Sequence, residues 1–153
     1  MILLTRVDHR LLHGQVAFSW TSHLSANCIL VANDKAATDD QQKTIIKLAK
    51  PSGVKLVIKT INDSIEALNS GVTDKYNLFI IIGNIDDAYK LIENVDSIKE
   101  LNLGGTKFEE EKKSLSSAVF VTQEEYEKLQ KLLSDGVEIY TQQVPRDKKK
   151  KIE

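Results

Sequence analysis

Short runs of apolar residues alternate along the chain with longer segments in which apolar residues recur every three or four positions. The short runs are rich in β-branched residues and predict strands, whereas the longer segments predict helices of about 8–13 residues. We predict strands at 2–7, 29–32, 54–59, 78–82, 98–103, 118–121 and 137–141, and helices at 15–24, 38–50, 62–68, 86–93 and 122–133.

Strands that alternate with helices indicate an α/β fold with a mostly parallel, open sheet of about seven strands. Right-handed crossovers would place helices on both faces of this sheet. The run 78–82 is apolar at successive positions, which is typical of a strand buried on both sides. The chain of 153 residues shows no internal repeat or linker, and we expect a single domain over 1–153.

Two of the helices carry recognisable capping signals. Thr122 stands three residues before Glu125, which is the spacing of a capping box. Asn62 or Asp63 is expected to cap the helix that ends before Gly71.

The segment 6–16 is polar and joins the first predicted strand to the first predicted helix. It contains two arginines, two histidines, an aspartate and a glycine, in the sequence Arg-Val-Asp-His-Arg-Leu-Leu-His-Gly-Gln-Val. Backbone N–H groups at such a turn point at a bound anion, and the helix dipole favours negative charge there. Ligands of α/β sheets bind beyond the carboxyl ends of the strands, which is where this segment emerges. The pattern indicates a site that holds a phosphoryl group and accepts it covalently.

Each polar residue of this segment has an expected role. His13 is the candidate nucleophile, and Arg10 lies three residues earlier, close enough to contact the phosphoryl oxygens. Asp8 could orient an imidazole ring or hold Arg10. Arg6 is a weaker candidate for phosphate binding and could instead be structural.

The start of the helix and two further turns complete the expected site. The backbone N–H groups of Gly14, Gln15 and Val16 open the helix and are candidates for phosphate binding. Residues that follow the second and fifth strands could line the pocket or simply form turns. These possible pocket-wall residues are Asn33, Asp34, Gly104 and Gly105.

Composition excludes several other classes of protein. The formal net charge is −1, so no overall positive field attracts nucleic acid. The single cysteine, Cys28, cannot form an intramolecular disulfide, and the longest apolar runs are too short to span a membrane. His9 and His13 alone are too few ligands for zinc, and two nearby arginines would repel a divalent cation. We therefore expect neither a metal nor an organic cofactor.

The residues alone leave two alternatives to phosphoryl transfer. A non-catalytic phosphate- or nucleotide-sensing module would use the segment 6–16 only for binding, and a phosphohydrolase would release inorganic phosphate from a histidine intermediate. The basic tail 146–151 is expected to be a frayed end, and a weaker hypothesis assigns it to an anionic membrane surface.

The segment 6–16 with Trp20 resembles the start of the IIB subunits in the mannose/fructose/sorbose family of the bacterial phosphoenolpyruvate-dependent sugar phosphotransferase system. Weaker similarities to this family follow in the same order along the chain, at 31–34, 49–55, 102–105, 136–139 and 143–145. The resemblance implies a mostly parallel sheet with one antiparallel edge strand.

The resemblance also implies an activity, that of a protein-N(pi)-phosphohistidine–sugar phosphotransferase. His13 would receive a phosphoryl group from a phosphorylated IIA protein, and Arg10 would steady that group. His13 would then pass it to a sugar bound by the membrane components IIC and IID. The protein would be cytoplasmic and would associate with the inner face of the membrane through these components. No IIA-like segment precedes Met1, so the donor is expected to be a separate chain. The sequence does not identify the sugar, the oligomeric state, the part played by His9 or the role of the basic tail.

Overall fold

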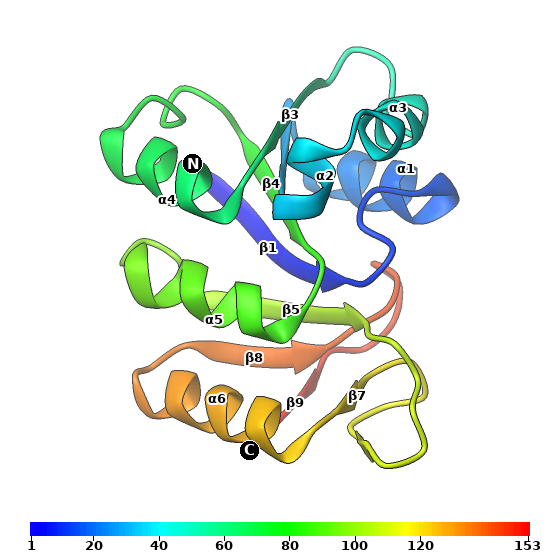
Figure 1. Ribbon diagram of the computed structural model, residues 1–153, viewed down its shortest axis with the longest axis vertical. Coiled ribbons are helices and arrows are strands. Elements are labelled where there is room, and N and C mark those ends of the chain that lie inside the picture. The colour runs from blue at the N-terminus through cyan, green and yellow to red at the C-terminus, as the bar shows by residue number, and fades with distance from the viewer.

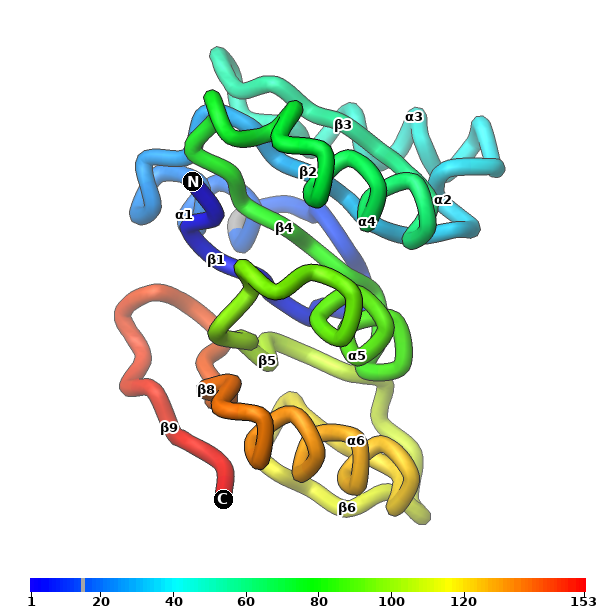
Figure 2. Tube along the Cα trace, turned by 90° about the vertical axis from the view of Figure 1, so that its left-hand side faces the viewer, coloured from blue at the N-terminus to red at the C-terminus, as the bar shows by residue number. Residues whose placement is uncertain are grey.

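The computed structural model describes residues 1–14 and 16–153. Within these residues, one mixed sheet of seven strands has the order β3-β2-β4-β1-β5-β8-β9, which can be followed from top to bottom in Figure 2. Neighbouring strands are parallel except for β8 and β9, which are antiparallel. The strands are β1 (Ile2–Asp8), β2 (Cys28–Ala32), β3 (Lys55–Lys59), β4 (Leu78–Ile82), β5 (Glu100–Gly105), β8 (Glu138–Thr141) and β9 (Lys150–Lys151).

Helices cover both faces of this sheet (Figure 1). One apolar layer contains buried side chains of α4, α5 and α6, and the other contains buried side chains of α1, α2 and α3. The predicted α/β class, with a mostly parallel sheet and an antiparallel edge strand, is confirmed. The helices are α1 (Gly14–Leu24), α2 (Asp34–Thr38), α3 (Asp40–Leu48), α4 (Ile61–Ser70), α5 (Ile85–Asn94) and α6 (Gln123–Ser134).

Strand β4 shows how the sheet is buried. Side chains of Leu78, Ile80 and Ile82 enter one apolar layer, and those of Phe79 and Ile81 enter the other. Each of the five is at most 2% exposed. The uninterrupted apolar run in the sequence therefore reflects burial on both faces, as expected.

The expected sixth strand does not join the main sheet. Its residues form β7 (Phe120–Val121), which pairs antiparallel with β6 (Lys113–Ser114) in a separate small sheet. The antiparallel edge of the main sheet comes instead from β9, in the tail that was expected to be frayed. Lys150 and Lys151 pair with β8, and the ammonium group of Lys149 lies 4.6 Å from the centre of the Tyr140 ring.

Capping residues add a short helix before the predicted helix 38–50 and move the start of another. The Asn33 side chain accepts a hydrogen bond from the N–H of Ala36 and begins α2, whereas Asp39 caps the separate helix α3. Thr60 caps α4, so the prediction that Asn62 or Asp63 does so is wrong. A residue must have extended backbone geometry to cap a helix, and Thr60 has it.

The predicted capping box at the start of α6 is confirmed. Thr122 accepts a hydrogen bond from the N–H of Glu125, and the Glu125 side chain accepts one from the N–H of Thr122. The two partners lie three residues apart in one local turn, and the motif therefore needs no tertiary contact.

Arg6 lies on β1 and is only 1% exposed. Its Nη1 donates hydrogen bonds to Asn102 Oδ1 at 2.7 Å and to the carbonyl oxygen of Gln142 at 2.9 Å. Its Nη2 donates to the carbonyl oxygen of Gln143 at 3.0 Å and to Asp8 Oδ2 at 3.3 Å. Burial lowers the pKa of Arg6, and the charge of Asp8 opposes this shift. The guanidinium therefore ties β1 to β5 and to the segment after β8.

This arrangement gives Arg6 a structural role instead of the phosphate contact considered from the sequence. Both Nη atoms already donate to protein acceptors, and Nε is buried without a partner. A phosphoryl group could reach the Nη atoms only if these bonds were broken.

Gly104 on β5 makes room for the Arg6 guanidinium. A Cβ atom at this position would lie 2.0 Å from Arg6 Cζ, far inside van der Waals contact. The next residue, Gly105, differs because the nearest atom to its Cβ position is His9 Nδ1, at 3.6 Å. Absence of a side chain is thus required at Gly104 but not at Gly105.

We predict that Gly104→Ala lowers the free energy of unfolding by about 3 kcal/mol, because the added methyl group displaces a buried charge whose two Nη atoms are hydrogen-bonded. The matched control Gly105→Ala should change it by less than about 1 kcal/mol. Urea unfolding followed by circular dichroism measures both values. Equal losses in the two variants would contradict the steric explanation.

Candidate functional site

The loop between β1 and α1 lies at the carboxyl ends of the strands. In Figure 1 it occupies the right-hand side, with the segment that follows β5 and the segment that follows β8. The N–H of His9 donates to the carbonyl oxygen of Gly105 at 3.0 Å, which joins the loop to the end of β5. Helix connections leave β1 and β5 on opposite faces of the sheet, and ligands of α/β proteins bind between strands of this kind.

Asp8 is the last residue of β1 and is 3% exposed. Its Oδ1 accepts a hydrogen bond from the N–H of Arg10 at 3.0 Å. Its Oδ2 lies 3.3 Å from Arg6 Nη2 and 3.0 Å from His13 Nε2. Asp8 therefore contacts the backbone of Arg10 rather than its guanidinium, and it orients the ring of His13.

His13 is the N-cap residue of α1 and has an extended backbone. Its side chain does not cap the helix, and 22% of the side chain is exposed. An ionised Asp8 accepts hydrogen bonds only, so Nε2 of His13 carries the hydrogen in this pair. In the neutral ring Nδ1 then holds the lone pair, which makes Nδ1 the nucleophilic atom.

Two residues with positive φ shape the turn between Asp8 and α1. Leu11 has φ of 59°, its N–H donates to the carbonyl oxygen of Asp8, and its side chain is buried. Gly14 has φ of 38°, in the region that favours glycine. The first N–H groups of a helix have no partner within it, so those of Gly14 and Val16 are available at the start of α1. Gln15, also expected to bind phosphate, lies outside the described residues.

The guanidinium of Arg10 differs from that of Arg6. Arg10 is exposed, and it forms no ion pair with another residue that the structure describes. It lines a cavity of about 260 Å³ together with Asp8, Val16, Gly104 and Gly105. Arg10 is thus free to contact an anion in this cavity, next to the residue that orients His13.

A second cavity of about 420 Å³ lies at the same edge of the sheet. His9 and Thr106 line both cavities, and Asn33 lines the second one. Asp34 lines neither cavity, and its Oδ1 accepts a hydrogen bond from the N–H of Ile61 at 2.8 Å. Of the four residues expected to form a pocket wall, Asp34 therefore has a structural contact and the other three face cavities.

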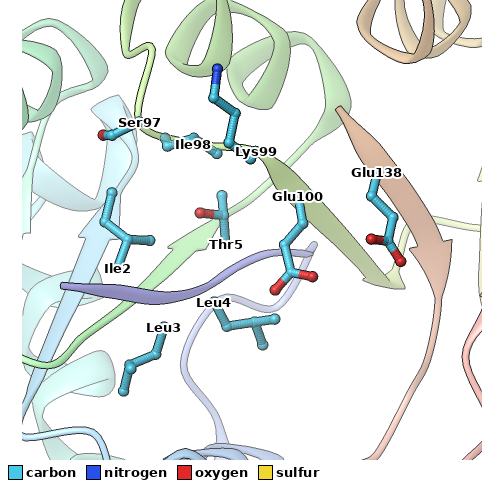
Figure 3. A pocket seen from close by; sticks show the side chains of 9 residues that line it. All are labelled: Ile2, Leu3, Leu4, Thr5, Ser97, Ile98, Lys99, Glu100 and Glu138. Atoms are coloured by element: carbon cyan, nitrogen blue, oxygen red, sulfur yellow. The ribbon is translucent and has the colours of Figure 1, made fainter. Parts of the chain in front are cut away.

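A further pocket, of about 330 Å³, lies at the opposite end of β1 (Figure 3). It is lined by residues from the first half of β1 and by Glu100 and Glu138, which are neighbours in the register of β5 and β8. The lining carries these two carboxylates and one ammonium group, that of Lys99, so its net charge is negative and disfavours a phosphoryl group.

The residues that support the loop were not identified from the sequence. Asn102 and the carbonyl oxygens of Gln142 and Gln143 hold the Arg6 guanidinium. Trp20 was expected to pack in the core and is 2% exposed, and it also donates from Nε1 to the carbonyl oxygen of Gln143 at 3.0 Å. Carbonyl oxygens carry no sequence signal, since every residue has one.

Two other features are absent from the described residues. These residues contain no group of three or more His, Cys, Asp or Glu side chains placed to hold a metal ion. No helix among them is long and apolar enough to cross a membrane. The arrangement of Asp8, Arg10 and His13 supports covalent acceptance of a phosphoryl group by an oriented imidazole.

Comparison with known proteins gives a consistent result over the whole chain. The family model described as PTS system sorbose subfamily IIB component matches residues 2–153. The N-acetylgalactosamine-specific phosphotransferase enzyme IIB component 1 of Escherichia coli strain K12 is 36% identical over 152 residues, which cover 99% of this chain and 96% of that protein. The mannose-specific EIIAB component of the same strain is 31% identical over 99% of this chain, and the match covers 47% of that longer protein.

The fold agrees with these similarities. The crystal structure of the N-acetylgalactosamine-specific IIB component 1 from Escherichia coli superposes with a TM-score of 0.92 at 34% identity, and the match covers 100% of both chains. The chain therefore belongs to the sorbose-subfamily IIB components of sugar phosphotransferase systems.

Proposed function

We propose that the chain accepts a phosphoryl group on Nδ1 of His13 and passes it to a sugar. The observation that carries this proposal is the 3.0 Å contact between Asp8 and His13 Nε2. Because Asp8 engages Nε2, the other ring nitrogen is the one available to attack phosphorus. The same contact stabilises the positive charge that the ring acquires when Nδ1 forms its bond to phosphorus.

Charge on the transferred group is balanced by the remainder of the loop. Arg10 supplies a guanidinium that no described carboxylate occupies, and the start of α1 supplies the N–H groups of Gly14 and Val16. Phosphoryl transfer is catalysed mainly by positioning and by stabilising charge on the oxygens of the transferred group. Arg10 and these N–H groups therefore act as the phosphoryl-binding groups, and Gly104 and Gly105 form the opposite wall.

We propose a phosphorylated IIA protein as the donor and a sugar bound by the membrane components IIC and IID as the acceptor. The name of the mannose-specific EIIAB relative places IIA and IIB in one protein, and this chain covers 47% of it. This supports a direct exchange between the two components. The protein would then work in the cytoplasm, at the inner face of the membrane where IIC and IID receive it.

We predict that His13→Ala abolishes labelling of the chain when it is incubated with labelled phosphoenolpyruvate, the general proteins of the system and a IIA protein. His9→Ala should still take up label, because Asp8 orients His13 and has no hydrogen bond to the His9 ring. The adduct should be labile to acid and stable to base, as expected for a phosphorus–nitrogen bond on histidine.

Three results of this labelling experiment would contradict the proposal. Label that persists in His13→Ala would make His9 the acceptor. A chain that binds phosphate but never becomes labelled would be a sensing module. Release of inorganic phosphate from model esters by the isolated chain would indicate a phosphohydrolase.

We predict that Arg10→Ala slows labelling about 10²-fold, because one charged donor to the phosphoryl oxygens is lost. Arg10→Lys should recover part of this loss, since it keeps the charge but not the bidentate geometry. Both variants should unfold within about 0.5 kcal/mol of the parent, because Arg10 is exposed. Rapid-quench labelling and urea unfolding measure the two effects. An unchanged labelling rate would remove Arg10 from the site.

A further inference from the structure

Transfer to a sugar raises a chemical requirement that transfer between two histidines does not. A neutral imidazole attacks phosphorus with a lone pair and has no proton to lose from that atom. A sugar hydroxyl must lose its proton as the oxygen–phosphorus bond forms. A base that accepts this proton is a recurrent part of phosphoryl transfer to hydroxyl groups.

The cavity beside the phosphoryl-binding loop offers two side chains that could accept a proton near neutral pH. Its lining contains one carboxylate, Asp8, and one imidazole, His9, among residues such as Thr106, Ser117 and Gln143 that are not bases. Both oxygens of Asp8 already accept hydrogen bonds, and the residue is 3% exposed. Asp8 is therefore committed to orienting His13 and to balancing the charge of Arg6.

His9 has the opposite properties. It is exposed, and its ring forms no hydrogen bond or ion pair with any other residue that the structure describes. Its backbone is nevertheless held, because its N–H donates to the carbonyl oxygen of Gly105 at 3.0 Å. The ring lies next to β5, with Nδ1 3.6 Å from the position that a Cβ atom of Gly105 would take. An imidazole without a hydrogen-bond partner among the described residues therefore lines both cavities.

We propose that His9 is the general base for the sugar step, a role that rests on the proposed function of His13. The sugar oxygen forms a bond to phosphorus, and the bond between phosphorus and Nδ1 of His13 breaks, with its electron pair returning to Nδ1. The hydroxyl proton moves to the basic nitrogen of His9, which later releases it to water. The ring of His13 ends neutral, with its Nε2–H still donating a hydrogen bond to Asp8.

The position of His9 between the cavities gives the acceptor a route to the site. The larger cavity, of about 420 Å³, is lined by amide side chains that suit hydroxyl groups, including those of Asn33, Gln42 and Asn84. A hydroxyl that enters from either cavity meets His9, because His9 lines both. The charged residues that line these cavities are Arg6, Asp8, Arg10, Lys35, Lys107, Lys112 and Glu125.

The test measures the two transfers separately in single-turnover experiments. The first transfer is from labelled IIA to the chain. The second is from the labelled chain to N-acetylgalactosamine, mannose, fructose or sorbose, in the presence of membranes that contain the IIC and IID components. The parent is compared with His9→Asn, which has no base, with His9→Asp, which supplies a different one, and with His23→Asn. His23 is exposed on α1 and lines neither cavity, so it controls for the substitution itself.

We predict that His9→Asn slows the sugar step about 100-fold and changes the IIA step by no more than about twofold. His9→Asp should recover at least about tenfold of the lost rate, and His23→Asn should match the parent in both steps.

The remaining outcomes separate this proposal from the proposed function. A sugar step in His9→Asn within about threefold of the parent would overturn the base role while leaving His13 as the acceptor. An equal fall in both steps would do the same, since it would assign His9 to the phosphoryl site in general. A parent that takes no label, or that delivers label to none of the four sugars, would overturn the proposed function and the base role together.

Discussion

The buried guanidinium of Arg6 is the interaction on which the site depends. A charge removed from water must be paired and hydrogen-bonded, and loss of one partner of a buried ion pair costs about 3–5 kcal/mol. Asp8 is the anionic partner of Arg6, and the remaining acceptors come from Asn102 and from the two carbonyl groups after β8. Because Arg6 holds Asp8 in place, Asp8 can hold the ring of His13 in one orientation.

The two arginines of the segment 6–16, Arg6 and Arg10, have different electrostatic roles. Arg6 is buried in the fold, where both of its Nη atoms donate to protein acceptors, and its charge is part of the structure. Arg10 follows the end of β1 and points to solvent, with its charge uncommitted among the described residues. Phosphate chemistry needs both properties, since an oriented nucleophile requires a rigid support and an arriving anion requires an unoccupied cation.

The surroundings of the loop come from distant parts of the chain. Strand β1 lies between β4 and β5, so the loop that follows β1 meets the ends of both neighbours. Gly104 leaves space for the Arg6 guanidinium, and the His9 ring lies next to Gly105. The indole N–H of Trp20 donates a hydrogen bond to the carbonyl oxygen of Gln143, which also accepts one from Arg6. Parallel strands bring such residues together because their carboxyl ends share one edge of the sheet.

Local sequence determined the elements and the chemical character of the loop. Apolar periodicity identified the strands of the parallel sheet, the spacing of Thr122 and Glu125 identified the capping box of α6, and a run of polar residues identified the turn after β1. Each of these signals depends on residues close together in the chain. Tertiary structure decided what periodicity does not encode: which strand takes the sheet edge, which arginine is buried and which nitrogen of His13 is free. Those outcomes depend on pairing with β8, on carbonyl oxygens near 142 and on the space left at Gly104, and such contacts exist only once distant segments are packed together.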